Sequence, residues 1–241
     1  YDNVTSHVVV HVDDLLVSSN SSEHMKELQQ QLRDKFKDIT VDSGDEFSYL
    51  GMLIKRDRKA RTLQLSQESF IKQMLVDYEI NDTANAPAIS TLCNLPPGDR
   101  VNAQKFRSLV MKMMYCSTRT RPDTLFPVSY LATFSNDPRS EHMTAAYHVL
   151  KYLNGTPNLC KTFRATTSEL KTLEVYADAS YATHQDSKSH SGFCVYTDID
   201  SACIYSRSVK QKYVTRSSTD AEVGSMDIAL QSAAFIRGIY T

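Results

Sequence analysis

Runs of apolar residues, interrupted by short polar turns, mark the predicted strands in the first quarter of the chain. Residues 8–17 read VVVHVDDLLV, which predicts a strand, a tight turn and a second strand. Residues 47–55, FSYLGMLIK, predict a strand that contains a glycine. The charged run 55–61, KRDRKAR, predicts a turn, and a short strand at 62–66 returns from it. This part of the chain is therefore predicted to contain two strand-turn-strand units.

Apolar residues that recur every three or four positions predict helices in the segments beside these strands. The first helix follows Asn20, which together with Glu23 predicts a capping box at its start. Residues 81–100 hold three of the seven prolines and predict a loop. Four further helices are predicted at about 67–78, 102–118, 122–135 and 138–153, the last ended by Asn154-Gly155 and Pro157.

The pattern changes from Leu173 onward. Residues 160–172 predict a linker or an edge strand. Three strands are then predicted at 173–180, 191–198 and 202–208, followed by a helix at 217–237. The predicted fold class is therefore α+β, with strands and helices in a first region and a βββα unit in a second.

Composition narrows the choice of protein class only slightly. The 241 residues are 41% hydrophobic and 23% charged, and 27 Lys and Arg nearly balance 28 Asp and Glu, so net charge indicates no particular partner. Five cysteines without metal-binding spacing predict no zinc site and no disulfide, and they favour an intracellular setting. No apolar run reaches the roughly 18 residues of a membrane span, and no signal peptide is visible. The chain begins with Tyr, which we interpret as the sign of a longer protein.

The adjacent acids Asp13 and Asp14 are the first candidate for chemistry. Two carboxylates at a tight strand turn suit Mg²⁺, which takes oxygen ligands and keeps several waters. In a two-metal site such ions align the attacking and leaving oxygens of a phosphoryl transfer. A surface turn with ordinary polar residues accounts for the pair equally well, although the apolar residues on both sides weaken that interpretation.

Several motifs follow one another along nearly the whole chain. Val12-Asp13-Asp14 in the predicted hairpin is followed by FSYLGMLIKR, LQLSQESFIKQML, RSLVMKMMYCSTRTRPD and AAYHVLKYLNGTP, and then by YADAS, SHSGFCV and VKQKYVTRSSTDAEV. In this order they resemble the polyprotein of copia-type LTR retrotransposons. Val12-Asp13-Asp14 is similar to the catalytic motif of reverse transcriptases, the next four motifs resemble later segments of the polyprotein, and the last three resemble the start of its ribonuclease H domain.

This resemblance implies a domain order. Residues 1–100 are expected to be the C-terminal part of a reverse transcriptase palm and the start of the thumb. Residues 101–165 are expected to be a helical thumb or connection, and residues 166–241 the N-terminal part of a ribonuclease H-like domain with a truncated βββα lobe.

The resemblance also implies the site residues. Four acids are expected to be catalytic and to bind Mg²⁺: Asp13, Asp14, Asp178 and Glu222. Without the resemblance, Asp178 is an ordinary strand-end residue and Glu222 a solvated helix residue. Six residues are expected to contact nucleic acid, the second and third of them as the primer grip: His11, Leu50, Gly51, Lys210, Lys212 and Arg216. A solvated basic face is an equally good account of the last three, and His142 and His148 are expected to be structural.

The chain also departs from the family pattern. It has no tryptophan, and Met143, Tyr181 and Tyr205 stand where the family usually has one. His11 replaces the usual aromatic residue, which should alter the contact with the primer-terminal nucleotide, and Met111 replaces a glycine. Each acid set needs one more member that is expected outside these 241 residues. The Mg²⁺ sites are therefore expected to be incomplete, and the chain alone is expected to be inactive.

Two functions follow as hypotheses. The first is a fragment of a retrotransposon RNA-directed DNA polymerase and ribonuclease H, acting on an RNA template and an RNA/DNA hybrid when whole. The second is a domesticated or decayed, non-catalytic copy that serves as a structural or RNA-binding subunit of a larger assembly. Neither involves a membrane.

Overall fold

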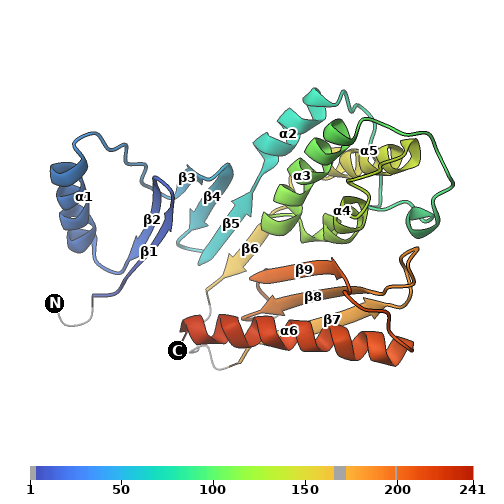
Figure 1. Cartoon of the computed structure of the whole chain (residues 1–241). Coiled ribbons are helices and arrows are strands. Elements are labelled where there is room, and N and C mark those ends of the chain that lie inside the picture. The colour runs from blue at the N-terminus through green and yellow to red at the C-terminus, as the bar shows by residue number, and fades with distance from the viewer. Residues whose placement is uncertain (1–3, 166–171, 199, 241) are drawn as a thin grey trace.

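The computed structural model describes residues 4–165, 172–198 and 200–240. These residues form three antiparallel sheets together with a cluster of helices (Figure 1). The sheets contain strands β1-β2, strands β3-β4-β5-β6 and strands β7-β8-β9, in that order. The predicted α+β fold class is confirmed.

The first sheet is a hairpin of β1 (Ser6–His11) and β2 (Asp14–Ser19), as residues 8–17 predicted. Helix α1 (Ser22–Phe36) follows it. The predicted capping box at Asn20 is wrong, because Ser21 is the N-cap and its side chain accepts a hydrogen bond from the His24 N–H. The Asn20 side chain instead accepts a hydrogen bond from the Thr5 N–H, which holds the base of the hairpin.

The second sheet joins segments from both ends of the first region. Its strands are β3 (Glu46–Tyr49), β4 (Met52–Asp57), β5 (Thr62–Ser66) and β6 (Lys161–Arg164). Strand β6 pairs with β5 at the edge of the sheet, so of the linker or edge strand predicted for 160–172 the edge strand is found at residues 161–164. The remainder of that segment lies mostly outside the described residues.

The predicted single strand at 47–55 is wrong, because the chain turns at Leu50 and Gly51. Both residues have positive φ, at 48° and 69°, a backbone region that glycine enters readily and leucine rarely. The Tyr115 hydroxyl donates a hydrogen bond to the Leu50 carbonyl. Tertiary contact with the helical region therefore helps to hold this turn.

Helices pack around the largest core of the molecule. They are α2 (Glu68–Asp77), α3 (Ala103–Arg119), α4 (Leu125–Ala132) and α5 (Ser140–Gly155), with short 3-10 turns η1 (Leu92–Asn94) and η2 (Pro122–Thr124). The predicted helix at 122–135 thus begins with a 3-10 turn and ends at residue 132. The core includes the fully buried side chains Phe106, Leu109, Val110, Met113, Val128, Leu131 and Leu150.

A buried arginine connects two ends of this helical region. Arg121 is 1% exposed and donates hydrogen bonds to the Asp123 carboxylate at 2.7 Å and to the Thr156 carbonyl at 2.8 Å. Its guanidinium also lies over the Tyr152 ring. These contacts satisfy the charge in the interior, and they join η2 to the end of α5.

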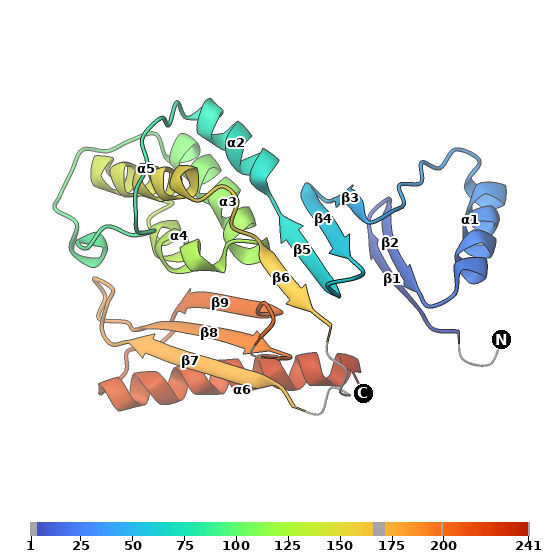
Figure 2. The same cartoon turned by 180° about the vertical axis from the view of Figure 1, so that it is seen from behind.

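The third sheet and the last helix form the predicted βββα unit. Strands β7 (Glu174–Ser180), β8 (His190–Tyr196) and β9 (Tyr205–Lys210) precede α6 (Ser218–Tyr240). Helix α6 covers one face of this sheet, and α4 lies against the other (Figure 2). Burial of Phe193, Val195 and Ala229 holds α6 to its face.

Two histidines lie at the contact between α4 and the third sheet. His190 hydrogen-bonds Ser129 of α4 at 3.1 Å and Ser208 of β9 at 2.7 Å, and its Nδ1 lies 2.9 Å from His184 Nε2. Both imidazoles are buried, at 3% and 5% exposed. Burial lowers the pKa of each to about 4. Nearby Lys210 adds to the lowering at both residues, and His184 adds to it at His190.

We expect this pair to make folding sensitive to mild acid. The folded-state pKa values lie below the ordinary value of 6.5, so the unfolded chain binds protons first as pH falls from about 6.5 to 4, and stability is lost in that window. The expected loss between about pH 6.5 and pH 5 is roughly 2 kcal/mol per histidine. Urea unfolding at both pH values measures it. A His184→Gln, His190→Gln double variant should lose most of this pH dependence, and an unchanged dependence would contradict the assignment.

Candidate functional site

The first acid pair lies at the tip of the β1–β2 hairpin. Val12 and Asp13 form the two-residue turn, and Asp14 opens β2 opposite His11. Val12 has φ of 51°, a conformation that a β-branched residue rarely adopts. Both carboxylates are exposed, and within the described residues neither has a hydrogen bond or an ion pair. The oxygens of Asp13 and Asp14 are therefore available to a ligand.

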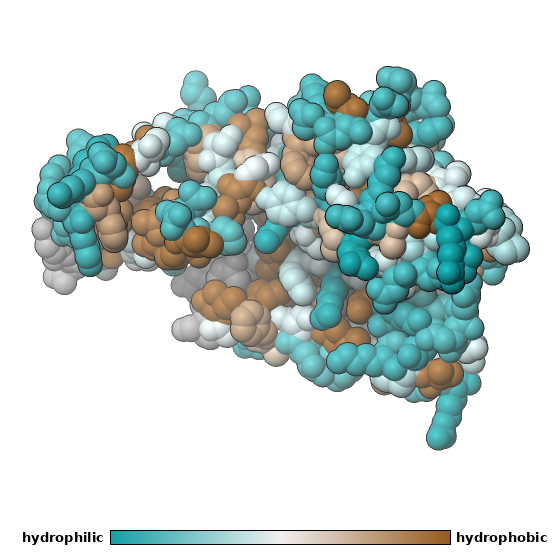
Figure 3. Space-filling model, turned by 45° about the horizontal axis from the view of Figure 1, so that its top comes forward, coloured by the Kyte–Doolittle hydropathy of each residue, from teal (hydrophilic) through white to brown (hydrophobic). Residues whose placement is uncertain are grey.

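The hairpin around these acids has an open apolar surface. Strand β1 pairs only with β2 among the described residues. Its valines are about half exposed or more, and Val12 is 83% exposed. Figure 3 shows hydrophobic surface gathered over this hairpin, at the left of the view.

The second acid pair comes from strand β7 and helix α6. The Ser225 hydroxyl donates a hydrogen bond of 2.7 Å to the Asp178 carbonyl, which fixes this helix turn against the strand. Glu222 lies three residues before Ser225, one turn along the same side of α6. The fold therefore brings the Asp178 backbone against the helix turn that follows Glu222, although the two residues come from distant parts of the sequence.

Open space adjoins Asp178 on the sheet. Gly192 is its partner on β8, and a side chain added at Gly192 would meet no atom within 4 Å. Asp178 is exposed and Glu222 half-buried. The face of the sheet at Asp178 is thus accessible to a bulky ligand such as a nucleic acid backbone.

The side chains of both acid pairs carry oxygen donors of the kind that Mg²⁺ binds. Carboxylate oxygens are its preferred protein ligands, and one or two can suffice when waters complete the shell. Within residues 4–165, 172–198 and 200–240, no group of three or more His, Cys, Asp or Glu side chains could hold a metal ion. Neither acid pair is therefore joined by a third such ligand among the described residues.

The remaining predicted contact residues lie at three separate positions in the structure. His11 flanks the first acid pair at the hairpin, whereas Leu50 and Gly51 form the β3–β4 turn of the second sheet. Lys212 and Arg216 are exposed on the segment between β9 and α6. The basic residues therefore lie near Glu222 along the chain, apart from the hairpin acids.

Lys210 is more strongly engaged than its sequence suggested. Its ammonium lies 2.8 Å from Asp186, in the loop between β7 and β8. The hydrogen bond from Lys210 lowers the pKa of Asp186 to about 2. Sequence reasoning missed Asp186 because no periodic signal marks a loop carboxylate. It also missed Ser225. Its position one helical turn after Glu222 could have indicated that it lies on the same side of the helix.

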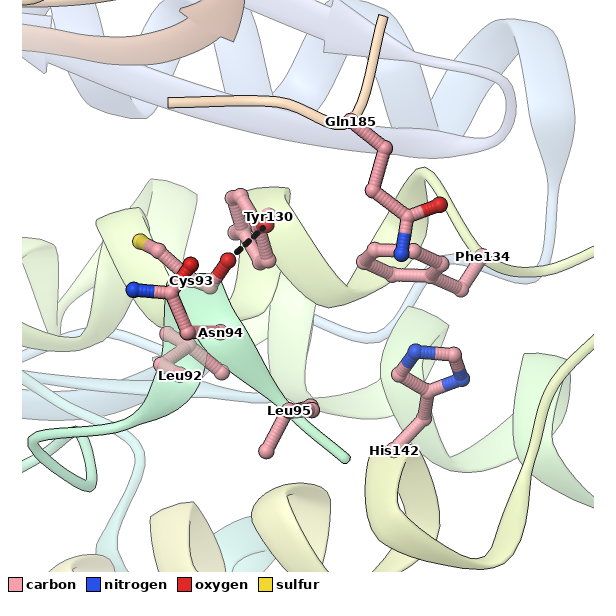
Figure 4. Close-up of a pocket in the computed structure, with 8 residues that line it drawn as sticks. All are labelled: Leu92, Cys93, Asn94, Leu95, Tyr130, Phe134, His142 and Gln185. Carbon is pink, nitrogen blue, oxygen red and sulfur yellow. Dashed lines mark hydrogen bonds between the residues drawn. The ribbon is translucent and has the colours of Figure 1, made fainter. Parts of the chain in front are cut away.

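A cavity of about 280 Å³ lies between the helical region and the β7–β8 loop. Figure 4 shows its aromatic wall and the Tyr130 hydroxyl, which donates to the Cys93 carbonyl. His142 stacks on Phe134 there, with ring centres 3.9 Å apart, and its Nδ1 accepts the Arg139 N–H, as expected for a structural histidine. The cavity is lined by Leu92, Cys93, Asn94, Leu95, Tyr130, Phe134, His142 and Gln185.

No described helix is long and apolar enough to cross a membrane. No protein-family model matches the chain, and no solved structure matches it. The informative similarities are to curated sequences.

The chain is 30% identical over 228 residues to the retrovirus-related Pol polyprotein from transposon TNT 1-94 of Nicotiana tabacum, with 89% of this chain and 16% of the relative covered. It is 30% identical over 186 residues to the putative transposon Ty5-1 protein of Saccharomyces cerevisiae, covering 75% of this chain and 58% of that protein. It is also 35% identical over 133 residues to secreted RxLR effector protein 161 of Plasmopara viticola, covering 54% of this chain and 90% of that protein. The chain therefore spans only part of the transposon proteins, and it belongs to the family of copia-type retrotransposon Pol polyproteins.

Proposed function

We propose that the chain is part of an RNA-directed DNA polymerase with ribonuclease H activity, which acts inside the cell on an RNA template and an RNA/DNA hybrid. Residues 1–100 would belong to the palm and the start of the thumb, 101–165 to the helical connection, and 166–241 to the ribonuclease H-like domain. The family relationship and the mixed α+β fold support this assignment. The chain spans 16% of the tobacco relative, so the activity would belong to a longer polyprotein.

The observation that carries the proposal is the contact between α6 and β7. The Ser225 hydrogen bond to the Asp178 backbone sets Glu222 one helical turn from that strand. Under this proposal the Asp178 and Glu222 carboxylates converge at this sheet edge, because a two-metal hydrolytic site requires acids from separate elements. Bound Mg²⁺ would there stabilise the charge of the scissile phosphate. Asp178 and Glu222 would hold the ion, and the nearby basic residues would hold the hybrid backbone.

The hairpin would serve synthesis in the same manner. Asp13 and Asp14 would hold Mg²⁺ beside the primer end, His11 would contact the terminal nucleotide, and the Leu50-Gly51 turn would support the primer strand. The exposed carboxylates and the strained Val12 support this role.

A second function rests on the count of acids. Each pair has only two members among the described residues, which favours a non-catalytic subunit that binds RNA or supports a larger assembly.

On either account the isolated chain should neither extend a primer nor cleave a hybrid with Mg²⁺. Primer extension and hybrid cleavage by the purified chain measure this, and hybrid cleavage that Asp178→Asn removes would contradict it.

Binding of the RNA/DNA hybrid tests the basic surface directly. We expect Lys212→Ala to weaken binding equally for every hybrid sequence and to lower the slope of log K against log salt by about 1, as for one lost phosphate contact. Lys210→Ala should have a smaller effect, because Asp186 already engages that ammonium. Fluorescence anisotropy at several salt concentrations measures both, with Lys35→Ala on α1 as the exposed control. A loss confined to one sequence would contradict contact with the backbone.

A further inference from the structure

Two thiols and a lysine lie together where the second sheet meets the third. Strand β6 contacts the segment just before β9, since the Ala202 N–H donates to the Thr162 carbonyl at 3.0 Å and the Arg164 N–H donates to the Ser201 hydroxyl at 3.1 Å. Lys161 opens β6, and Cys203 follows Ala202 directly. Neither proposed activity uses these residues.

A β-bulge turns Cys203 toward Cys194. Val195 pairs with Tyr205, yet its carbonyl also accepts the Ile204 N–H at 2.9 Å, so two residues of one strand lie opposite one of the other. Ile204 packs with Val195 in the core under α6. The next residue, Cys203, therefore faces the opposite side of the sheet, which is also the side of Cys194 because neighbouring strand residues alternate.

The surroundings of Cys203 favour its thiolate. Cys203 is 6% exposed, and the Cys194 thiol and Lys161 are its charged or polarisable neighbours. Lys161 is 7% exposed and has no carboxylate within ion-pair distance among the described residues, so a thiolate is the anion that its buried ammonium can pair with. The hydrogen bond from Cys194 and the charge of Lys161 lower the pKa of Cys203, whereas the pKa of Cys194 is raised.

Cys93, which is half-buried, and the buried Cys116 differ in this respect. Burial raises the pKa of Cys93, and it raises that of Cys116 to about 12. All five cysteines are free thiols in the structure. Cys93 therefore serves as an internal reference for ordinary reactivity.

We propose that Cys203 and Cys194 form a dithiol site that reacts with hydroperoxides. The Cys203 thiolate attacks one oxygen of the peroxide, so an S–O bond forms, the O–O bond breaks, and the departing oxygen takes a proton and leaves as alcohol or water. The Cys194 sulfur then displaces the hydroxyl group from the Cys203 sulfenic acid, which forms the S–S bond and releases water with the Cys194 proton. Two thiols are oxidised to a disulfide and one peroxide is reduced. Lys161 acts as a positioning residue that stabilises the thiolate.

The test treats the reduced, folded chain with one equivalent of hydrogen peroxide. Differential alkylation and peptide mass spectrometry should find one intramolecular disulfide between residues 194 and 203. In Cys194→Ser the reaction should stop at a Cys203 sulfenic acid, which dimedone traps. Iodoacetamide should label Cys203 at least about tenfold faster than Cys93, as one unit of pKa difference in thiolate fraction predicts at neutral pH. Cys93→Ser should leave the peroxide reaction unchanged.

Lys161 is tested by charge removal and charge retention. Lys161→Gln should slow oxidation of Cys203 about tenfold, and Lys161→Arg should restore most of the rate. If Lys161→Gln does not fold, the comparison of the labelling rates of Cys203 and Cys93 in the unaltered chain still decides whether Cys203 is the more reactive thiol. The proposal is overturned if Cys203 reacts no faster than Cys93, or if oxidation gives only intermolecular disulfides or sulfonic acid. An equal rate in folded Lys161→Gln overturns the role of the lysine.

Discussion

Asp13→Asn is expected to abolish DNA synthesis while hybrid cleavage continues, and Glu222→Gln is expected to do the reverse. Asp13 lies at the turn of the β1–β2 hairpin, whereas Glu222 lies in helix α6. Each acid pair would hold its own ions. A carboxylate that positions catalytic Mg²⁺ contributes several kcal/mol to transition-state stabilisation, so each variant should lower its own activity by roughly 10³-fold or more.

This prediction needs a polyprotein that supports both reactions. A chimera in which this chain replaces the matching segment of the tobacco polyprotein provides that context, with the unmutated chimera as reference. Asp42→Asn removes an exposed acid between α1 and β3 and should change neither activity. Primer extension and hybrid cleavage are measured on the same preparations. Loss of both activities in either variant would contradict separate sites, and a chimera that binds hybrid without either activity would favour the non-catalytic function.

Arg121→Met is expected to cost roughly 3 to 5 kcal/mol of folding stability. The substitution removes a fully buried guanidinium and leaves the inner side of Asp123 without its donor, while the Thr156 carbonyl keeps only the Leu159 N–H. Removing one member of a buried, hydrogen-bonded ion pair typically has this effect, and the lower end of the range applies here because Asp123 is 32% exposed. Few single substitutions in this chain should destabilise it more.

Urea unfolding followed by circular dichroism measures the change. Arg119→Met is the matched control, because Arg119 lies two residues earlier at the exposed end of α3 and should alter stability by no more than about 0.5 kcal/mol. Arg121→Lys should avoid only part of the loss, since an ammonium cannot reproduce the planar contacts of the guanidinium. Equal effects at 119 and 121 would mean that the buried network contributes little.

Long periodic segments were predictable from the sequence alone. The helices expected at 102–118 and 138–153 occur at Ala103–Arg119 and Ser140–Gly155, because their apolar positions recur with the helical period and stop signals follow them. The hairpin that carries Asp13 and Asp14 was also predictable, since two apolar runs enclose a polar pair.

Features that depend on tertiary contact were not predictable. The turn at Leu50 requires a rare backbone conformation for leucine, and its partner Tyr115 lies far along the chain. The pairing of Lys210 with Asp186 likewise depends on how the β7–β8 loop folds over the sheet. Asn20 and Ser21 are both good cap residues, and only the path of the hairpin decides between them.

The pairing of β6 with β5 has a consequence for folding order. Thr62 and Arg164 are partners although the whole helical region separates them, so the second sheet closes only after that region has left the ribosome. Until then β5 presents an unpaired edge to solvent and to other nascent chains. Closing so long a loop is entropically unfavourable unless α2, α3 and α5 have already collapsed into a compact unit that brings β6 near. The helical core would thus act as an internal scaffold for assembly of the sheet, and variants that loosen it should misfold at the β5 edge before they lose their helices.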